Sequence, residues 1–234
     1  MRLPRVSLML AAGVFLTLGT TASAQEPMMV SSCMDFAEPT TFEEVVASPA
    51  PASASPAVEE VRPVPAARPV PAPLDAGRLA DPATYRSVYR ILSTENSCSE
   101  FYGGPAKAAT AFNQFASRLK RGRLSDPRVA LRMTGNYTHY QDHASGAAYR
   151  IFEQATLNSN GPVAAHAARM QVGRYPGYTP QARALVLLHE LGHLVRGPKG
   201  GWLLPNDGND PGQSAVNTRL VEDHCADQLE TIRD

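Results

Sequence analysis

The chain has 234 residues, of which 43% are hydrophobic and 19% charged, and its 22 basic and 22 acidic side chains leave no net charge. This length suffices for one domain with a sizeable hydrophobic core. Because the net charge is zero, the chain has no general attraction to nucleic acid or to an anionic membrane, and we expect neither as a partner.

The first 24 residues have the pattern of a secretory signal peptide. Arg2 and Arg5 form its charged start, residues 6–18 its apolar segment, and Ala22-Ser23-Ala24 a cleavage site of small residues. The apolar segment is too short for a membrane anchor. The sequence therefore predicts a secreted or periplasmic protein without an integral membrane segment.

Residues 25–76 are predicted to form a disordered tail or linker. Proline and alanine are concentrated in residues 48–76, where large apolar side chains are scarce. Such a segment buries too little apolar surface to offset the entropy that it would lose on ordering. The folded domain is therefore expected over residues 77–234.

The domain is expected to begin with helices and to continue with a small sheet. The helices are predicted over residues 82–93 and 105–120, and short β-prone segments follow at 128–133, 148–152 and 155–158. Residues 155–163 are expected to form either an ordinary hairpin or the edge of the sheet, along which a peptide can bind. Two further helices complete the pattern, which predicts an α+β domain.

The sequence His-Glu-Leu-Gly-His at residues 189–193 is the most informative motif. Histidines four residues apart on a helix project from the same face, so His189 and His193 can reach one metal ion. Glu190 stands next to His189, where it can act as a general base in metal-assisted hydrolysis. Thr179 and Pro180 favour the start of this helix, as the N-cap residue and the first helical residue.

This motif resembles the active-site helix of the zincin-type zinc metallopeptidases. The resemblance implies a single zincin-like domain, Zn²⁺ as the cofactor, and a peptide or protein as the substrate. It also implies that His189 and His193 bind the metal and that Glu190 activates water.

A catalytic zinc ion needs a third protein ligand, and the motif supplies only two. Asp207 is the first choice, since it lies 14 residues after His193 in a loop whose glycines and prolines let the chain turn back. Glu222 and His224, on the predicted last helix, are the alternatives.

The residues after the motif match no standard zincin subgroup completely. A metzincin has glycine and histidine at the positions that Arg196 and Lys199 hold here. A gluzincin has a helical glutamate followed four residues later by aspartate, whereas Glu222 is followed by Ala226. The third ligand therefore stays open at the level of sequence.

The segment also resembles a group of uncharacterised secreted bacterial proteins that carry the same pentapeptide. Their pattern continues with an aspartate in a loop and then Ser-x-x-Asn-Thr-x-x-Val-x-x-x-Cys, which is met here by Asp207, Ser214, Asn217, Thr218, Val221 and Cys225. The resemblance supports Asp207 as a ligand. Ser214 and Asn217 are candidates for a hydrogen bond to a ligating histidine.

Three cysteines follow the predicted signal peptide, and in an oxidising compartment a pair within the domain should be bonded. Cys98 and Cys225 are the predicted pair, because Cys33 lies beyond the predicted linker. Cys33 then remains as a free thiol or as an intermolecular bridge.

The leading hypothesis is a secreted zinc metallopeptidase with His189, His193 and Asp207 as ligands and Glu190 as the catalytic base. The alternative is a non-catalytic metal-binding or cell-surface interaction domain on a zincin scaffold. A zinc hydrolase that cleaves amide bonds of the cell wall is a third possibility.

Overall fold

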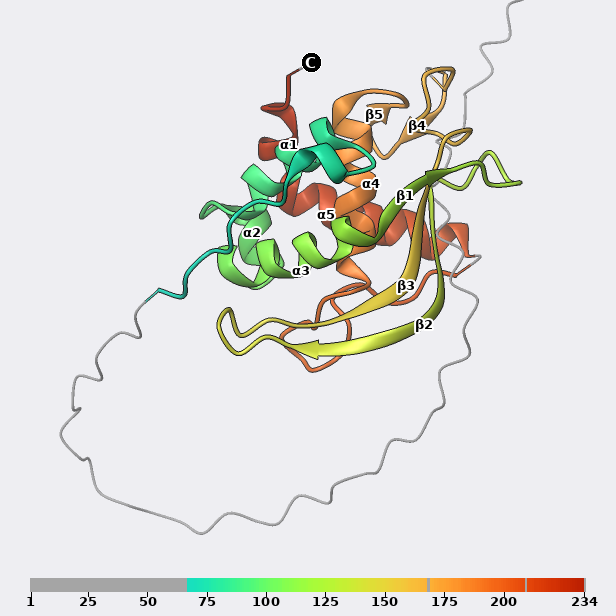
Figure 1. The fold of residues 1–234 in the computed structure, drawn as a ribbon. Coiled ribbons are helices and arrows are strands. Elements are labelled where there is room, and N and C mark those ends of the chain that lie inside the picture. Colours follow the sequence, from blue (N-terminus) through green and yellow to red (C-terminus); the bar gives the residue numbers. More distant parts are fainter. Residues whose placement is uncertain (1–66, 168, 209, 234) are drawn as a thin grey trace, which may run out of the picture.

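The computed structural model describes residues 67–167, 169–208 and 210–233 (Figure 1). These residues form a small α+β domain in which the helices gather beside a curved three-stranded sheet. The predicted α+β class is confirmed. The predicted signal peptide, most of the predicted tail and Cys33 lie outside the described residues.

The helices predicted to start at residues 82 and 105 begin where the sequence places them, and a short helix that was not predicted lies between them. A short 3-10 turn, Ala76–Arg78, precedes α1 (Pro82–Leu92), α2 (Ser97–Phe101) and α3 (Pro105–Arg118). The side chain of Asp81 caps α1 by accepting a hydrogen bond from the Thr84 N–H. The helix predicted over residues 105–120 ends two residues early, because Leu119 already belongs to strand β1.

The sheet consists of β1 (Leu119–Gly122), β2 (Leu131–Gln141) and β3 (Ala148–Asn158), in the order β1-β3-β2. β3 is therefore the central strand, antiparallel to β2 and parallel to β1. Of the two alternatives for residues 155–163, the sheet edge is wrong, since Ala155, Thr156 and Leu157 pair with both β1 and β2. The parallel partner β1 comes from the end of α3, a long-range pairing that local sequence patterns do not show.

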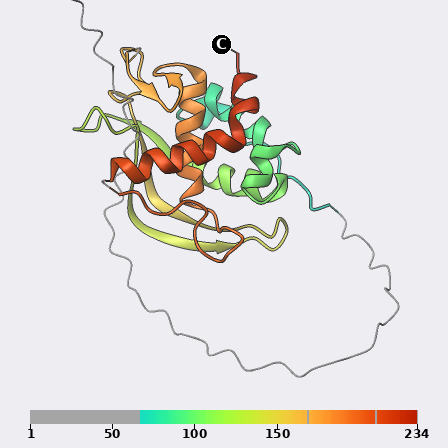
Figure 2. The ribbon, with the colours of Figure 1, turned by 180° about the vertical axis from the view of Figure 1, so that it is seen from behind.

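The second half of the domain contains a short hairpin and two long helices. β4 (Gln171–Val172) and β5 (Tyr175–Pro176) precede α4 (Pro180–Gly192), and α5 (Pro211–Glu230) follows it. Thr179 caps α4 through its side chain, as predicted, and Asp210 caps α5 in the same way. Seen from behind, α5 crosses α4 (Figure 2).

α4 passes through the core of the domain. Ten of its 13 residues are buried, including the polar residues His189 and Glu190. Polar groups in such a place need partners, because burying them without hydrogen bonds or charges to pair with is costly. The segment after α4 continues into the sheet, since Val195 bridges Tyr149 and Arg196 bridges Trp202.

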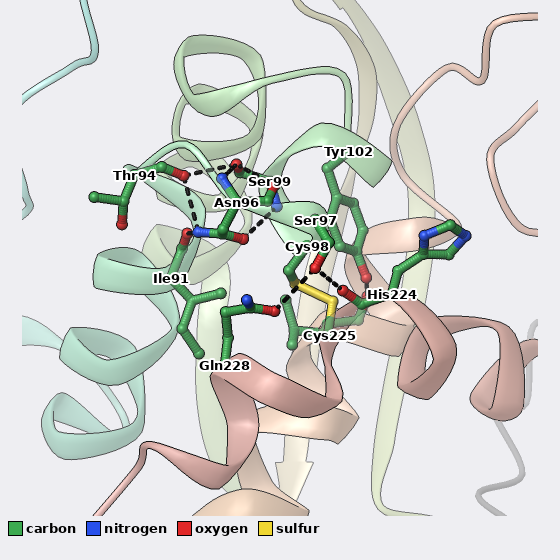
Figure 3. The surroundings of a disulfide bond; sticks show 11 residues. Ile91, Thr94, Asn96, Ser97, Cys98, Ser99, Tyr102, His224, Cys225 and Gln228 are labelled. Carbon is green, nitrogen blue, oxygen red and sulfur yellow. Dashed lines mark hydrogen bonds between the residues drawn. A yellow bond between two sulfur atoms is a disulfide. The ribbon is translucent and has the colours of Figure 1, made fainter.

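A disulfide joins Cys98 on α2 to Cys225 on α5, which confirms the predicted pair (Figure 3). Beside it, the Ser97 hydroxyl donates to the His224 carbonyl at 2.7 Å. The Tyr102 hydroxyl donates to the Leu188 carbonyl at 2.6 Å. These contacts tie α2 to both of the long helices.

The end of the predicted tail lies against the first helices. The Asn113 side chain donates to the Ala72 carbonyl at 3.0 Å, and the Leu74 N–H donates to the Tyr85 hydroxyl at 2.7 Å. Residues 72–74 therefore make ordered contacts with α1 and α3. Within the part of the chain that the structure describes, no helix combines the length and apolar character needed to cross a membrane.

Candidate metal centre

Three side chains that the sequence predicted as ligands meet at the end of α4. His189 comes from its last turn, His193 is its C-cap residue, and Asp207 comes from the loop between α4 and α5. One ligand atom from each lies within 4.8 Å of the other two, and all three residues are buried. The structure therefore brings together the predicted set.

The distances among these atoms suit a shared cation better than a proton. His189 Nε2 lies 2.9 Å from Asp207 Oδ2 and 3.1 Å from His193 Nε2. His193 Nε2 lies 3.4 Å from Asp207 Oδ1. A ring nitrogen has one proton or one lone pair, so His189 Nε2 cannot bond to both neighbours at once. A cation between the three atoms would accept all of their lone pairs; the group by itself does not select zinc over other metals.

Thr218, on α5, holds the ring of His189 from the other side. Its Oγ1 lies 3.0 Å from His189 Nδ1, and both side chains are buried. A hydroxyl that accepts the Nδ1 proton leaves the Nε2 lone pair directed at the centre. Sequence reasoning proposed Ser214 or Asn217 for this role and missed Thr218. The Ser214 hydroxyl has no hydrogen bond within the described residues.

Asn217 acts on the loop that carries Asp207. Its side-chain amide donates to the Pro205 carbonyl at 2.9 Å, while its oxygen accepts from Gln213 Nε2 at 2.9 Å. Asn217 is buried. Because its amide could not form a replacement hydrogen bond to water there, loss of the hydrogen bond to Pro205 would be costly. It fixes the loop two residues before the aspartate.

Leu204 is the second anchor of the same loop. Its N–H donates to the Gly192 carbonyl at 3.0 Å, and its side chain is fully buried. A Cβ at position 192 would lie 2.4 Å from Leu204 Cδ1, far closer than side chains pack. The glycine of the motif therefore leaves the space in which Leu204 docks the loop onto α4.

Burial and the mutual contacts set the ionisation of the centre. Burial lowers the pKa of the His189 imidazole, although its hydrogen bond to Asp207 opposes the shift. Burial would by itself raise the pKa of Asp207, but the imidazoles of His189 and His193 outweigh it and hold this pKa well below its usual range. A neutral imidazole and an ionised carboxylate are the forms that bind a metal ion.

Arg150, on β3, supports the end of α4. Its Nε donates to the His193 carbonyl at 3.1 Å, in a buried position. A cation at a helix C-terminus interacts favourably with the free carbonyl groups there. Sequence reasoning did not identify this residue, which lies 43 residues away in the chain.

The alternative third ligands lie elsewhere. Glu222 Oε1 accepts a hydrogen bond from the Arg174 N–H at 2.7 Å and lies 3.6 Å from Arg174 Nε. The His224 ring is exposed and stacks on Phe101, with 4.4 Å between the ring centroids. Neither residue belongs to the metal-binding group.

Glu190, the predicted base, is fully buried in the last turn of α4, and its carbonyl accepts the His193 N–H at 3.2 Å. The three ligands are also closed to solvent. A cavity of about 300 Å³ lies between the end of α2, the β2–β3 turn and the segment after α4; Tyr102, Ala148 and Val195 are among its lining residues, and none of the three ligands is.

The centre therefore consists of three converging ligand atoms, a hydroxyl behind one imidazole, and a buried glutamate in the same helical turn. Comparison of the chain with protein-family models, with curated proteins and with solved structures gave no match. The resemblance to zincins consequently depends on the motif and on the residues around it.

Proposed function

We propose that the chain is a secreted, zinc-dependent hydrolase that cleaves peptide bonds and has a zincin-like fold. The observation that supports this proposal most is the buried group of His189, His193 and Asp207. Two imidazoles from an HExxH helix together with a carboxylate from another segment are typical ligands of a catalytic zinc ion. The disulfide is compatible with an oxidising compartment outside the cytosol.

The residues of the chain fit this chemistry. Zinc, when bound, would supply a Lewis acid and lower the pKa of water. His189, His193 and Asp207 would hold the ion, with Thr218 keeping His189 in the tautomer that presents Nε2. Glu190 would take a proton from the attacking water and return it to the leaving amine.

The test combines metal content with turnover in three forms of the mature protein. We expect wild type to contain about one zinc ion per chain and to cleave an unfolded protein substrate. His193→Ala should lose both properties, since it removes a ligand. Glu190→Gln should keep the zinc and lose turnover, since the amide cannot accept the proton.

The results distinguish the role of Glu190 as the base from the role of the three ligands in binding the metal. Hydrolysis retained in Glu190→Gln would refute the glutamate as the base. Zinc absent from wild type, even after incubation with the metal at neutral pH, would refute the metal centre itself. A chelator control should abolish turnover of wild type and should restore it when zinc is added back.

The burial of the centre favours a second candidate, a non-catalytic metal-binding domain. Structural metal sites are closed, whereas catalytic sites keep a position open for water. Here the side chains of His189, His193 and Asp207 are all 0% exposed. A wild-type protein that holds zinc and gains stability from it, but cleaves neither unfolded protein nor cell wall, would support this candidate.

A further inference from the structure

One face of the sheet carries a cluster of aromatic and arginine side chains next to the metal centre. The pairs Tyr137–Phe152 and His139–Arg150 lie opposite each other on β2 and β3, and Arg196 bridges Trp202 beyond them. Side chains of opposite residues in a sheet share a face. We call this cluster the arginine–aromatic face; its members are Tyr137, His139, Arg150, Phe152, Arg196 and Trp202.

Trp202 is the centre of this cluster. The guanidinium carbons of Arg150 and Arg196 lie 4.1 Å and 4.4 Å from its ring centroid. The His139 ring stacks on it, with 5.7 Å between centroids and 16° between planes. Contacts of a cation with an indole at these distances are favourable. The indole is therefore held in one orientation while staying half-buried.

The two arginines differ in exposure. Arg150 is buried among the rings of Tyr137, Phe152 and Trp202 and donates to the His193 carbonyl. Arg196 is exposed, and its Nη1 donates to the Gly200 carbonyl at 2.6 Å. It forms no ion pair within the described residues, although a guanidinium has five N–H donors.

These features suit an anionic group in a peptide. None of the six side chains carries a carboxylate, so the exposed guanidinium meets no competing acid inside the face. A guanidinium binds a carboxylate through two parallel hydrogen bonds, and adjacent aromatic rings exclude water from such a contact. Nucleic acid is a poor candidate because the chain has no net positive charge.

We propose that the arginine–aromatic face binds the side-chain carboxylate of an acidic peptide. Arg196 makes the charged contact, and the rings of Trp202 and His139 pack against the peptide. Arg196 lies three residues after His193. Since an extended peptide spans about 3.3–3.6 Å per residue, a peptide of a few residues that is bound at Arg196 can extend towards the candidate metal centre. Binding is independent of catalysis; only the use of this face to select acidic substrates rests on the proposed function.

Trp202 gives a direct readout, because it is the single tryptophan of the chain. The mature Glu190→Gln protein is titrated with an acetylated and amidated alanine-rich hexapeptide that contains two glutamates, and tryptophan fluorescence is recorded. We expect a saturable change. The same peptide with glutamines should bind at least about tenfold more weakly, since it lacks the charge-assisted contact.

Arg196→Gln should raise the dissociation constant for the glutamate peptide about tenfold, whereas the matched control Lys199→Gln should change it less than about twofold. Lys199 is exposed in the hairpin that the Arg196–Trp202 bridge closes, and its substitution removes the same charge. Arg196→Lys keeps the charge without the planar fork and should lie between wild type and Arg196→Gln. This order across the three variants separates a direct contact from a disturbed hairpin.

Equal binding of the glutamate and glutamine peptides would overturn the proposal, as would equal effects of Arg196→Gln and Lys199→Gln. If inorganic phosphate displaces the peptide at a concentration below that of the peptide, the face is a general anion site and not a site for peptide carboxylates. If wild type cleaves no peptide but this binding persists, the proposed function fails and the binding face stands.

Discussion

The candidate metal-binding group draws its side chains from two regions that are built differently. His189 lies in the last turn of α4, and His193 is the C-cap residue, whose backbone is still in the helical region, so local helical geometry places both on one face. Asp207 lies in the loop between α4 and α5; after the Arg196–Trp202 bridge, residues 203–208 belong to no helix or strand. The loop is fixed instead by contacts of Leu204 with Gly192 and of Asn217 with Pro205.

This difference shows where the centre can be weakened selectively. Changes in the helix itself alter the core, because α4 is buried over most of its length. Changes in the loop anchors should move Asp207 while leaving the two histidines in register.

Leu204→Ala is expected to destabilise the domain and to loosen the loop together. Leu204 is fully buried, and a large-to-small change at such a site costs about 2–5 kcal/mol. Denaturant unfolding measures the stability, and a zinc titration measures the affinity. The neighbouring Leu203 is only partly buried, so Leu203→Ala is the matched control. Zinc affinity unchanged in Leu204→Ala would show that the loop does not depend on this anchor.

Thr218→Val is expected to weaken zinc binding through His189, the ligand in the last turn of α4. The substitution keeps the shape of the side chain but removes the hydroxyl behind His189 Nδ1. Loss of such a partner typically weakens metal binding about 10–100-fold. Competitive zinc titration measures this change, and Thr218→Ser, which keeps the hydroxyl, should restore most of the affinity. Equal affinities for the valine and serine variants would contradict the assigned role.

Gly192→Ala tests the contact between the two regions. Alanine favours a helix over glycine by about 1 kcal/mol, yet its Cβ would meet Leu204 at 2.4 Å. Overpacking of this kind costs about 1–3 kcal/mol, so we expect a net loss of stability. Thermal unfolding provides the measurement. The double variant Gly192→Ala/Leu204→Ala should lose less than the sum of the single variants, since the clash is removed. If the losses of stability of the two single variants add fully in the double variant, the alanine at position 192 does not clash with Leu204.

Much of the fold could be predicted because its helices carry local start patterns. Asp81, Thr179 and Asp210 cap α1, α4 and α5, and each is followed directly by a proline. The sheet was predicted less well. The parallel pairing of β1 with β3 joins residues far apart in the chain, and the central place of β3 follows from it.

The candidate site shows the same division. The spacing of His189 and His193 predicted two of the residues that meet, and the glycine- and proline-containing loop made Asp207 the first choice for the third while leaving Glu222 and His224 open. Thr218 and Arg150 could not be assigned, because their roles depend on distances to His189 and His193 across separate elements. The arginine–aromatic face likewise exists only where β2, β3 and the hairpin after α4 lie side by side.

The sequence by itself determined the helix that carries the motif and its two histidines; it also predicted the pairing of Cys98 with Cys225 and offered Asp207 as the first of three candidates for the third ligand. Helical periodicity and capping are local, so they can be recognised along the chain. Only the tertiary structure decided which hydroxyl orients His189, which anchors hold Asp207, and that the centre is closed to solvent. Packing between distant segments sets burial and hydrogen-bond partners, and no local pattern contains that information.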